Sequence, residues 1–302
     1  MKGFLLFAGI IFSVLALNGQ AIRLATYQYA ENNRIHNIQP LADHLGKNYG
    51  YKVQVKSYAT VHEFIKAIRQ NEVDIALINT FGYLLLEAPG TGYPMQPVTA
   101  LEVKQDARDN YKTAILVSAG SGTKELKDII KQASAETLAL VSPGSTSGNL
   151  VPRLALAEAG IPEPEKTFKS VIYTRTHAAA IDALLEGKAQ VAAMGFTTYE
   201  SFRKSDTAGG QQVRTIWLSP EIPLGPVLFN KRFSSVVGNE LLQAFLGLKD
   251  KDPAALEAIK AGWSEARQST HFIPINRSYY DSFKKNLGRD KDLERILQQF
   301  LE

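Results

Sequence analysis

The sequence of 302 residues contains no cysteine, so neither disulfide bonds nor thiolate metal centres can support its fold. It also lacks a basic run, because 34 Lys and Arg are scattered among 30 Asp and Glu, with a formal net charge of +4. Nucleic-acid-binding proteins concentrate positive charge on one surface, and we therefore expect no nucleic-acid partner. The composition is that of a globular protein, and the length suggests about two domains.

Long hydrophobic runs are absent except near the N-terminus. Lys2 precedes an uncharged stretch, residues 4–17, that is shorter than the ~20 apolar residues of a membrane-spanning helix. This pattern is typical of a secretory signal, and Gly19 and Ala21 are small residues suited to cleavage after Ala21. We expect residues 1–21 to be a signal peptide and the mature chain, which has no cysteine for lipid attachment, to diffuse freely in the periplasm. An uncleaved anchor and secretion into the medium are the alternatives.

The remaining chain alternates between strand-like and helix-like segments. Residues 22–27, 51–58 and 73–78 have the pattern of strands, with helical spacing between them. This order predicts an open, mostly parallel sheet at the start of the mature chain. A second unit of the same kind extends from residue 113 to residue 218.

Two such units without a flexible linker predict an α/β fold of two lobes, each an open mixed sheet flanked by helices. We expect residues 22–112 and 219–302 to form the first lobe and residues 113–218 the second. The hinge is then two crossing segments, near residues 111–113 and 217–219. Ligands of open α/β sheets bind beyond the carboxyl ends of the strands, which predicts a ligand between the lobes.

Residues 140–152, LVSPGSTSGNLVP, are the most informative segment. A strand ends there, a Pro-Gly turn follows, and Ser145, Thr146 and Ser147 precede a helix. The first turn of a helix has free N–H groups and a partial positive charge. The three hydroxyls add donors, and Gly148 allows an anion to approach the backbone. The segment predicts a site for a tetrahedral oxyanion that needs neither a metal nor a catalytic base.

A simple helix cap is the alternative interpretation, because one hydroxyl is enough to cap a helix. Two enzyme motifs do not fit. A nucleophile elbow needs serine at the centre of G-x-S-x-G, where this chain has Thr146, and a phosphate-binding P-loop needs a lysine that this segment lacks.

Residues 173–181 again place a strand end before a helix start. Arg175 can pair bidentately with an oxyanion, and His177 can donate an N–H or titrate near neutral pH. An exposed histidine in a first helical turn is the alternative. Tyr29 and Tyr83 follow strand ends of the first unit and are candidates to line the cleft.

Metal and cofactor sites are not predicted. The other four histidines have no ligand spacing, and the chain has no H-E-x-x-H motif. These histidines are His36, His44, His62 and His271.

With these motifs the sequence resembles the PhnD-like family, the phosphate-, phosphite- and phosphonate-binding proteins of ABC transporters. Residues 143–149 are the most specific match. Further similar segments are residues 40–45, 71–76, 176–181 with Gly187 and Lys188, and 272–274 with Tyr279. The resemblance implies a type II periplasmic binding fold in which Ser145, Thr146, Ser147 and His177 hold a phosphorus oxyanion.

The resemblance also implies a binding protein rather than an enzyme, a monomer that delivers its small anionic ligand to an ABC permease in the inner membrane. A sensory protein that presents the ligand to a membrane receptor, and a phosphoester-processing enzyme, are the alternatives. Three positions depart from the family pattern. Gly225 stands where relatives often have an acid that meets a ligand amine, Gln190 replaces an aspartate, and Val61 replaces a tyrosine. Glu221 is the alternative acid, so the substituent of the anion is left open.

Overall fold

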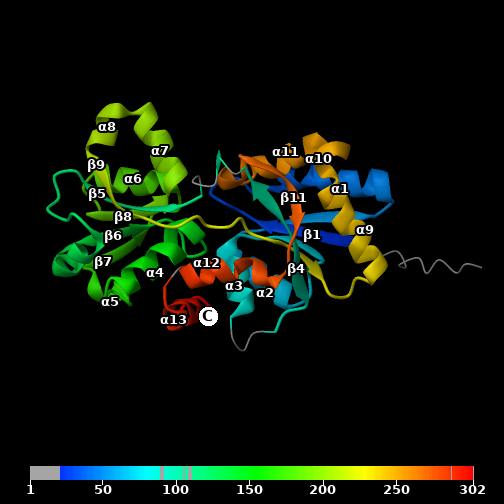
Figure 1. Cartoon of the computed structure of the whole chain (residues 1–302), viewed down its shortest axis with the longest axis horizontal. Coiled ribbons are helices and arrows are strands. Elements are labelled where there is room, and N and C mark those ends of the chain that lie inside the picture. Colours follow the sequence, from blue (N-terminus) through cyan, green and yellow to red (C-terminus); the bar gives the residue numbers. More distant parts are fainter. Residues whose placement is uncertain (1–20, 89–91, 105, 108–110, 287, 302) are drawn as a thin grey trace, which may run out of the picture.

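The computed structural model describes residues 21–301 except 89–91, 105, 108–110 and 287. Two β-sheets with helices on their faces form two lobes that lie side by side (Figure 1). Both sheets are mixed, so the predicted two-lobed α/β architecture is confirmed. The predicted signal peptide lies outside the described residues except for Ala21. No helix in the described part of the chain is long and apolar enough to cross a membrane.

The first lobe contains a six-stranded sheet in the order β11-β4-β10-β3-β1-β2. Its strands are β1 (Ile22–Tyr27), β2 (Val53–Tyr58), β3 (Ile75–Leu77), β4 (Met95–Val103), β10 (Val227–Asn230) and β11 (Ser269–Pro274). β1 is parallel to β2 and β3, whereas β10 is antiparallel to β3 and β4, and β11 is antiparallel to β4. The parallel part is the part that the strand and helix patterns predicted.

β4 and β11 were not predicted as strands. β4 contains Pro97, and a proline inside a strand pattern argues against a central strand. In the structure Pro97 pairs with Leu228 where the register of β10 and β4 shifts, so the ladder bends at the residue that lacks an N–H. This irregularity explains why the sequence pattern did not predict β4.

Eight α-helices of the described residues belong to the first lobe, and the first two lie where helical spacing was predicted between the strands. They are α1 (Ile35–Tyr49), α2 (Val61–Arg69), α3 (Thr80–Glu87), α9 (Ser235–Leu246), α10 (Leu248–Lys251), α11 (Pro253–Ala261), α12 (Asp281–Asn286) and α13 (Asp290–Gln298). In α2, the Thr60 hydroxyl caps the first turn by accepting from the N–H of Glu63, and Phe64 and Ile68 are fully buried. Thr60 and Val61, at the start of α2, lie at the edge of the space between the lobes.

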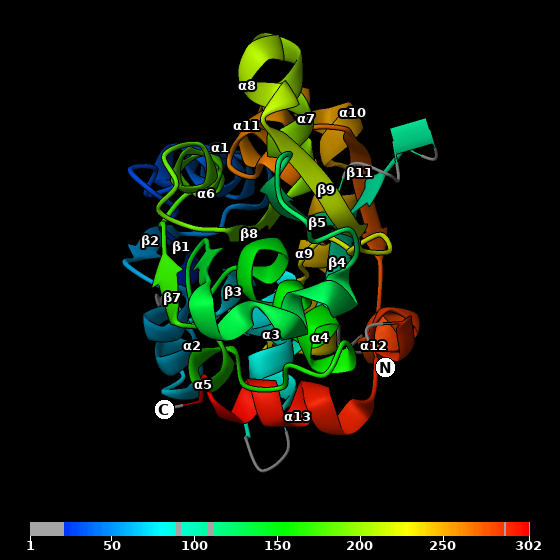
Figure 2. The ribbon, with the colours of Figure 1, turned by 90° about the vertical axis from the view of Figure 1, so that its left-hand side faces the viewer.

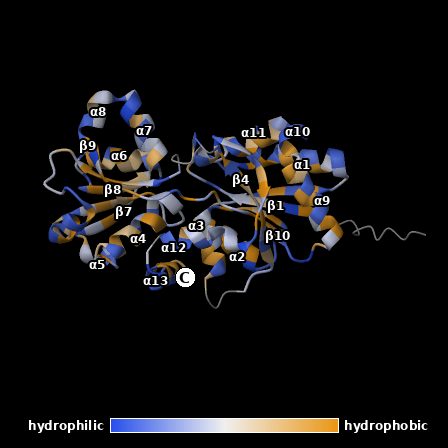
Figure 3. Cartoon of the chain, in the orientation of Figure 1, coloured by the Kyte–Doolittle hydropathy of each residue, from blue (hydrophilic) through white to orange (hydrophobic). Residues whose placement is uncertain are grey.

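The second lobe contains a five-stranded sheet in the order β7-β6-β8-β5-β9. Its strands are β5 (Thr113–Ser118), β6 (Thr137–Leu140), β7 (Ser170–Tyr173), β8 (Val191–Gly195) and β9 (Val213–Leu218). Its helices are a π-helical turn, η4 (Thr146–Leu150), continued by α4 (Val151–Glu158), and α5 (Pro164–Thr167), α6 (His177–Leu185), α7 (Phe196–Ser205) and α8 (Thr207–Gln211). Figure 3 shows the apolar residues concentrated on the strands and inner helix faces of both lobes.

Two crossing segments connect the lobes, and they bind each other. The N–H of Thr113 donates to the Ser219 hydroxyl over 2.8 Å, and the N–H of Ser219 donates to the carbonyl of Thr113 over 2.9 Å. The last helix makes a further connection, because α13 packs against α4 of the second lobe (Figure 2). Its Ile296 and Leu297 belong to the same buried cluster as Leu154.

Candidate functional site

A cleft of about 450 Å³ lies between the lobes. The first lobe contributes the segment after β1, the start of α2 and the loop after α11, and the second contributes the loops after β6 and β7. Six of the predicted site residues line this cleft, whereas Gly148 and Tyr83 do not. The six are Tyr29, Ser145, Thr146, Ser147, Arg175 and His177.

The loop after β6, Ser145–Ser147, presents its hydroxyls at the start of a helix, and we call it the oxyanion loop. The Ser145 hydroxyl caps the helix by accepting from the N–H of Gly148 over 3.0 Å. The Thr146 hydroxyl accepts from the N–H of Phe81 in the first lobe, also over 3.0 Å. A hydroxyl that accepts a hydrogen bond still has its own hydrogen, and accepting one polarises that hydrogen as a donor. Helix capping and anion binding are therefore compatible in this loop.

His177 is fixed in one tautomer by the backbone. The N–H of Gly195 donates to its Nδ1 over 2.9 Å, so Nδ1 carries no proton and the neutral ring carries its hydrogen on Nε2. Burial lowers the pKa of His177 to about 4. Of the two roles predicted for this residue, the structure favours the N–H donor over a group that titrates near neutral pH.

Ser147 and His177 meet at Gly195, although they come from different loops. A Cβ on Gly195 would lie 3.3 Å from the Ser147 hydroxyl oxygen and 3.5 Å from Cε1 of His177. The absence of a side chain at Gly195 thus lets a hydroxyl and an imidazole pack against the same backbone. The two predicted segments converge here, at the starts of two helices.

Tyr111 was predicted only as part of a crossing segment, but it also lines the cleft. Its hydroxyl interacts with the side chains of Thr146 and Ser147. Burial raises the pKa of Tyr111 well above its usual value, so the phenol stays neutral and keeps its hydrogen. The sequence signal for this role is a tyrosine within a crossing segment.

Gly148 and Tyr83 have structural explanations that differ from the predicted ones. A Cβ on Gly148 would lie 2.2 Å from Cγ2 of Val141, so close packing, and not the approach of an anion, accounts for the glycine. Tyr83 is 1% exposed in the core of the first lobe, where its ring packs 4.8 Å from that of Tyr280. It is the fourth residue of α3 and is not part of the cleft lining.

Backbone strain is concentrated at the cleft. Among the residues that the structure describes, four other than glycine have positive φ, and three of them line the cleft: Ala30 at 50°, Arg34 at 59° and Arg175 at 71°. Each such residue costs on the order of 1–3 kcal/mol, and such strain is a feature of functional sites. Arg175 is exposed there, whereas Arg34 is 4% exposed and was not predicted.

The departure at Gly225 has a steric cause. A Cβ at this position would lie 1.9 Å from the carbonyl oxygen of Ile78 and 2.6 Å from Cα of Asn79. No acidic side chain fits there without moving the backbone. Val61 does line the cleft, and it also packs against Gly144, where a Cβ would lie 2.8 Å from that of Val61.

Within the described residues no group of three or more histidine or acidic side chains is arranged to hold a metal.

Two lobes joined by two crossing segments, with a cleft between them, are typical of solute-binding proteins. The chain belongs to the family described as the periplasmic substrate-binding protein of phosphonate ABC transporters, which it matches over residues 26–280. The predicted family is thereby confirmed, and the family is periplasmic.

Similar proteins agree with this assignment. The phosphonates-binding periplasmic protein of Escherichia coli K12 is 25% identical over 243 residues, which are 79% of this chain and 69% of that protein. A binding protein of a phosphonate ABC transporter from Pseudomonas aeruginosa has a similar fold, with a TM-score of 0.67, 19% identity and coverage of 93% and 87%. PhnD1 from Prochlorococcus marinus in complex with methylphosphonate also gives a TM-score of 0.67, with 16% identity and coverage of 92% and 98%.

Proposed function

We propose that this protein captures a small phosphorus oxyanion, a phosphonate, phosphite or phosphate, in the cleft and delivers it as a monomer to an ABC permease in the inner membrane. The observation that carries the proposal is the convergence of the oxyanion loop and His177 at the starts of two helices. Three hydroxyls, the Nε2–H of His177 and the first-turn amides are all donors, which is what an anion requires.

Binding follows from hydrogen bonds and needs no chemistry. Each charge-assisted hydrogen bond contributes roughly 1.5–3 kcal/mol, so several converging bonds support tight binding. The Ser145 hydroxyl bonds to a backbone amide. His177 lies beside Ser147, but its Nδ1 accepts from Gly195 and its Nε2 carries the hydrogen, so the neutral ring has no free nitrogen to act as a base. A nucleophile would need such a base, and we therefore propose that no reaction takes place.

Calorimetry tests the proposal on protein freed of bound ligand by unfolding and refolding. We expect methylphosphonate, phosphite or phosphate to bind equally with and without EDTA. Replacing both Ser145 and Thr146 by alanine should weaken binding at least tenfold. Ser234→Ala is the matched control, because Ser234 caps α9 in the same way, far from the cleft. No binding of any of these anions, or turnover of one, would reject the proposal.

A further inference from the structure

Four charged side chains line the cleft in the described residues: Arg34, Arg175, Arg267 and one acid, Glu265. Arg34 and Glu265 are the two of opposite sign whose contacts point to a ligand beyond the oxyanion loop. We propose that they bind the end of the ligand remote from phosphorus, with Arg34 facing a carboxylate and Glu265 an ammonium group. The ligand class is then an amino acid that carries a phosphonate or a phosphate ester. This inference rests on the proposed function, because it assumes that the phosphorus end occupies the oxyanion loop.

The size of the cleft leaves room for such a substituent. One water occupies about 30 Å³ in the liquid, and a tetrahedral oxyanion has only about five heavy atoms. Small-molecule sites bury about 70–90% of the surface of their ligand, which requires contacts on most sides of it. A cleft of about 450 Å³ is therefore several times larger than phosphite or methylphosphonate requires.

Arg34 is a buried cation held by uncharged groups. Its Nε donates to the carbonyl of Gly262 over 2.8 Å, and its Nη1 donates to that of Tyr27 over 3.2 Å. The guanidinium carbon lies 4.6 Å from the ring centre of Tyr27 and 4.5 Å from that of Trp263. None of these partners carries a negative charge, and no ion pair joins Arg34 to an acidic side chain of the described residues. A buried charge without a counterion is costly, so an anion brought by a ligand is favoured at this position.

The backbone also indicates that the position of Arg34 is specific. Arg34 precedes α1 with φ of 59° and ψ of 6°, and its N–H is held by the side-chain oxygen of Asn32 over 2.8 Å. The left-handed conformation is unfavourable for arginine, and it turns the side chain under the rings of Tyr27 and Trp263. A capping role alone would favour glycine or asparagine here.

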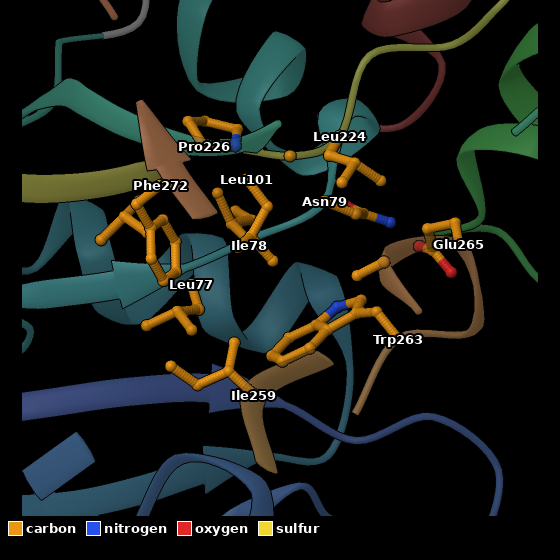
Figure 4. Close-up of a pocket in the computed structure, with 13 residues that line it drawn as sticks. Leu77, Ile78, Asn79, Leu101, Leu224, Pro226, Ile259, Trp263, Glu265 and Phe272 are labelled. Carbon is orange, nitrogen blue, oxygen red and sulfur yellow. The ribbon is translucent and has the colours of Figure 1, made fainter. Parts of the chain in front are cut away.

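Glu265 lines the same cleft from the loop after α11, together with a smaller cavity of about 40 Å³. Figure 4 shows its carboxylate at the end of the smaller cavity where Asn79 and Trp263 lie, away from Phe272. Its carboxylate accepts a hydrogen bond from the hydroxyl of the adjacent Ser264 over 3.2 Å. No cation of the described residues forms an ion pair with it.

Both charges act at the same place. Burial raises the pKa of Tyr29; Glu265 adds to that rise and Arg34 opposes it. Tyr27 is under the same two opposing influences. The guanidinium packs against the rings of Tyr27 and Tyr29, and Glu265 lines the same cleft, yet the two charged groups form no ion pair with each other. A ligand group that has both charges can satisfy both side chains, whereas a neutral group leaves each without an oppositely charged partner.

Four phosphonates with chains of similar length test the inference by calorimetry. Propylphosphonate is the neutral reference, 3-aminopropylphosphonate adds an amine, 3-phosphonopropionate adds a carboxylate, and 2-amino-3-phosphonopropionate has both. We expect the last compound to bind at least tenfold more tightly than propylphosphonate. Arg34→Gln should weaken the carboxylate-bearing compounds at least tenfold and Glu265→Gln the amine-bearing ones, with changes below about threefold for propylphosphonate.

Matched controls separate charge recognition from folding. Arg69→Gln removes a half-buried guanidinium that donates to a backbone carbonyl of the same lobe, and Glu257→Gln removes an exposed acid paired with Lys260. Neither should change the order of affinities. Should Arg34→Gln fail to fold, Glu265→Gln alone decides, because a half-buried acid with one local hydrogen bond is tolerant of replacement.

The outcomes distinguish the two proposals. Equal binding of all four compounds, or an equal loss for all four in Arg34→Gln, overturns the inference and leaves the oxyanion loop as the binding site. If the wild-type protein binds neither these compounds nor methylphosphonate, phosphite and phosphate, the proposed function fails as well.

Discussion

His177 shows how one backbone amide decides the chemistry of a side chain. The N–H of Gly195 occupies Nδ1, so in the proposed function only Nε2 is left for the ligand, as a neutral donor. A neutral donor favours the anion without the cost of desolvating an imidazolium. Affinity then depends on direction and distance more than on pH.

The pKa of His177 also affects stability. Burial lowers this pKa to about 4 in the folded protein, whereas an unfolded chain has a histidine pKa near 6.5. Between these values the unfolded state binds a proton that the folded state does not. The contribution of His177 to the free energy of unfolding is therefore fully present above pH ~6.5 and is lost as pH is lowered towards 4. Urea unfolding of the ligand-free protein should show a shallower fall over this window in His177→Gln. The exposed His36→Gln serves as control, and an identical pH dependence in wild type and His177→Gln would contradict the expectation.

At the scale of elements, the return segment after β9 passes close to the junction of β3 and α3. Gly225 is the point of contact, and the atoms that its Cβ would meet belong to the backbone of Ile78 and Asn79. Backbone atoms cannot move aside as a flexible side chain does. The segment therefore sets both the path of the second crossing and the absence of an acid at this place.

Gly225→Ala should reduce the free energy of unfolding by about 1–3 kcal/mol or more, because the added methyl overlaps the Ile78 carbonyl. Gly238→Ala is the matched control, since Gly238 lies inside α9 and, apart from the backbone of that helix, no atom lies within 4 Å of its Cβ. There we expect no loss and a gain of up to about 1 kcal/mol. Denaturant unfolding measures both, and similar stability of the two variants would show that the return segment can move.

At the scale of the whole molecule, hydrogen bonds between the lobes fix their separation. The side-chain amide of Asn79 donates to the carbonyl of Gly144 over 2.8 Å, and its oxygen caps α3 by accepting from Gly82 over 2.9 Å. Tyr29 adds a longer contact, since its hydroxyl accepts from the N–H of His177 over 3.4 Å. The oxyanion loop is thus held by the first lobe as well as by its own.

Asn79→Asp separates the two roles of this residue. Aspartate still caps α3, but it cannot donate to Gly144 and places a charge beside that carbonyl. We expect a weaker ligand affinity, by about tenfold, and a larger radius of gyration in X-ray scattering at equal ligand concentration, with little change in melting temperature. Asn276→Asp, which alters the cap of a 3₁₀ turn distant from the cleft, should change neither quantity. An unchanged affinity in Asn79→Asp would show that this bond does not hold the lobes together.

Local signals in the sequence determined much of the fold. Period-two and helical spacing placed β1, α1 and α2, because a buried face must repeat with the geometry of its element. Hydroxyl residues after a strand end marked the oxyanion loop. The lobe boundaries at residues 112–113 and 218–219, and the binding roles of the oxyanion loop, remain predictions.

Only the tertiary structure decided which residues meet in the cleft. Gly195, Tyr111, Arg34 and Glu265 carry no motif, since their roles arise from segments far apart in the chain that fold against one another. Conversely, Gly148 follows the hydroxyl residues and Tyr83 follows a strand end, but both residues are packed in the interior. Val141 and Tyr280 occupy the space around them. A sequence pattern reports the neighbours along one element, whereas burial, tautomer and unpaired charge depend on neighbours from all of them.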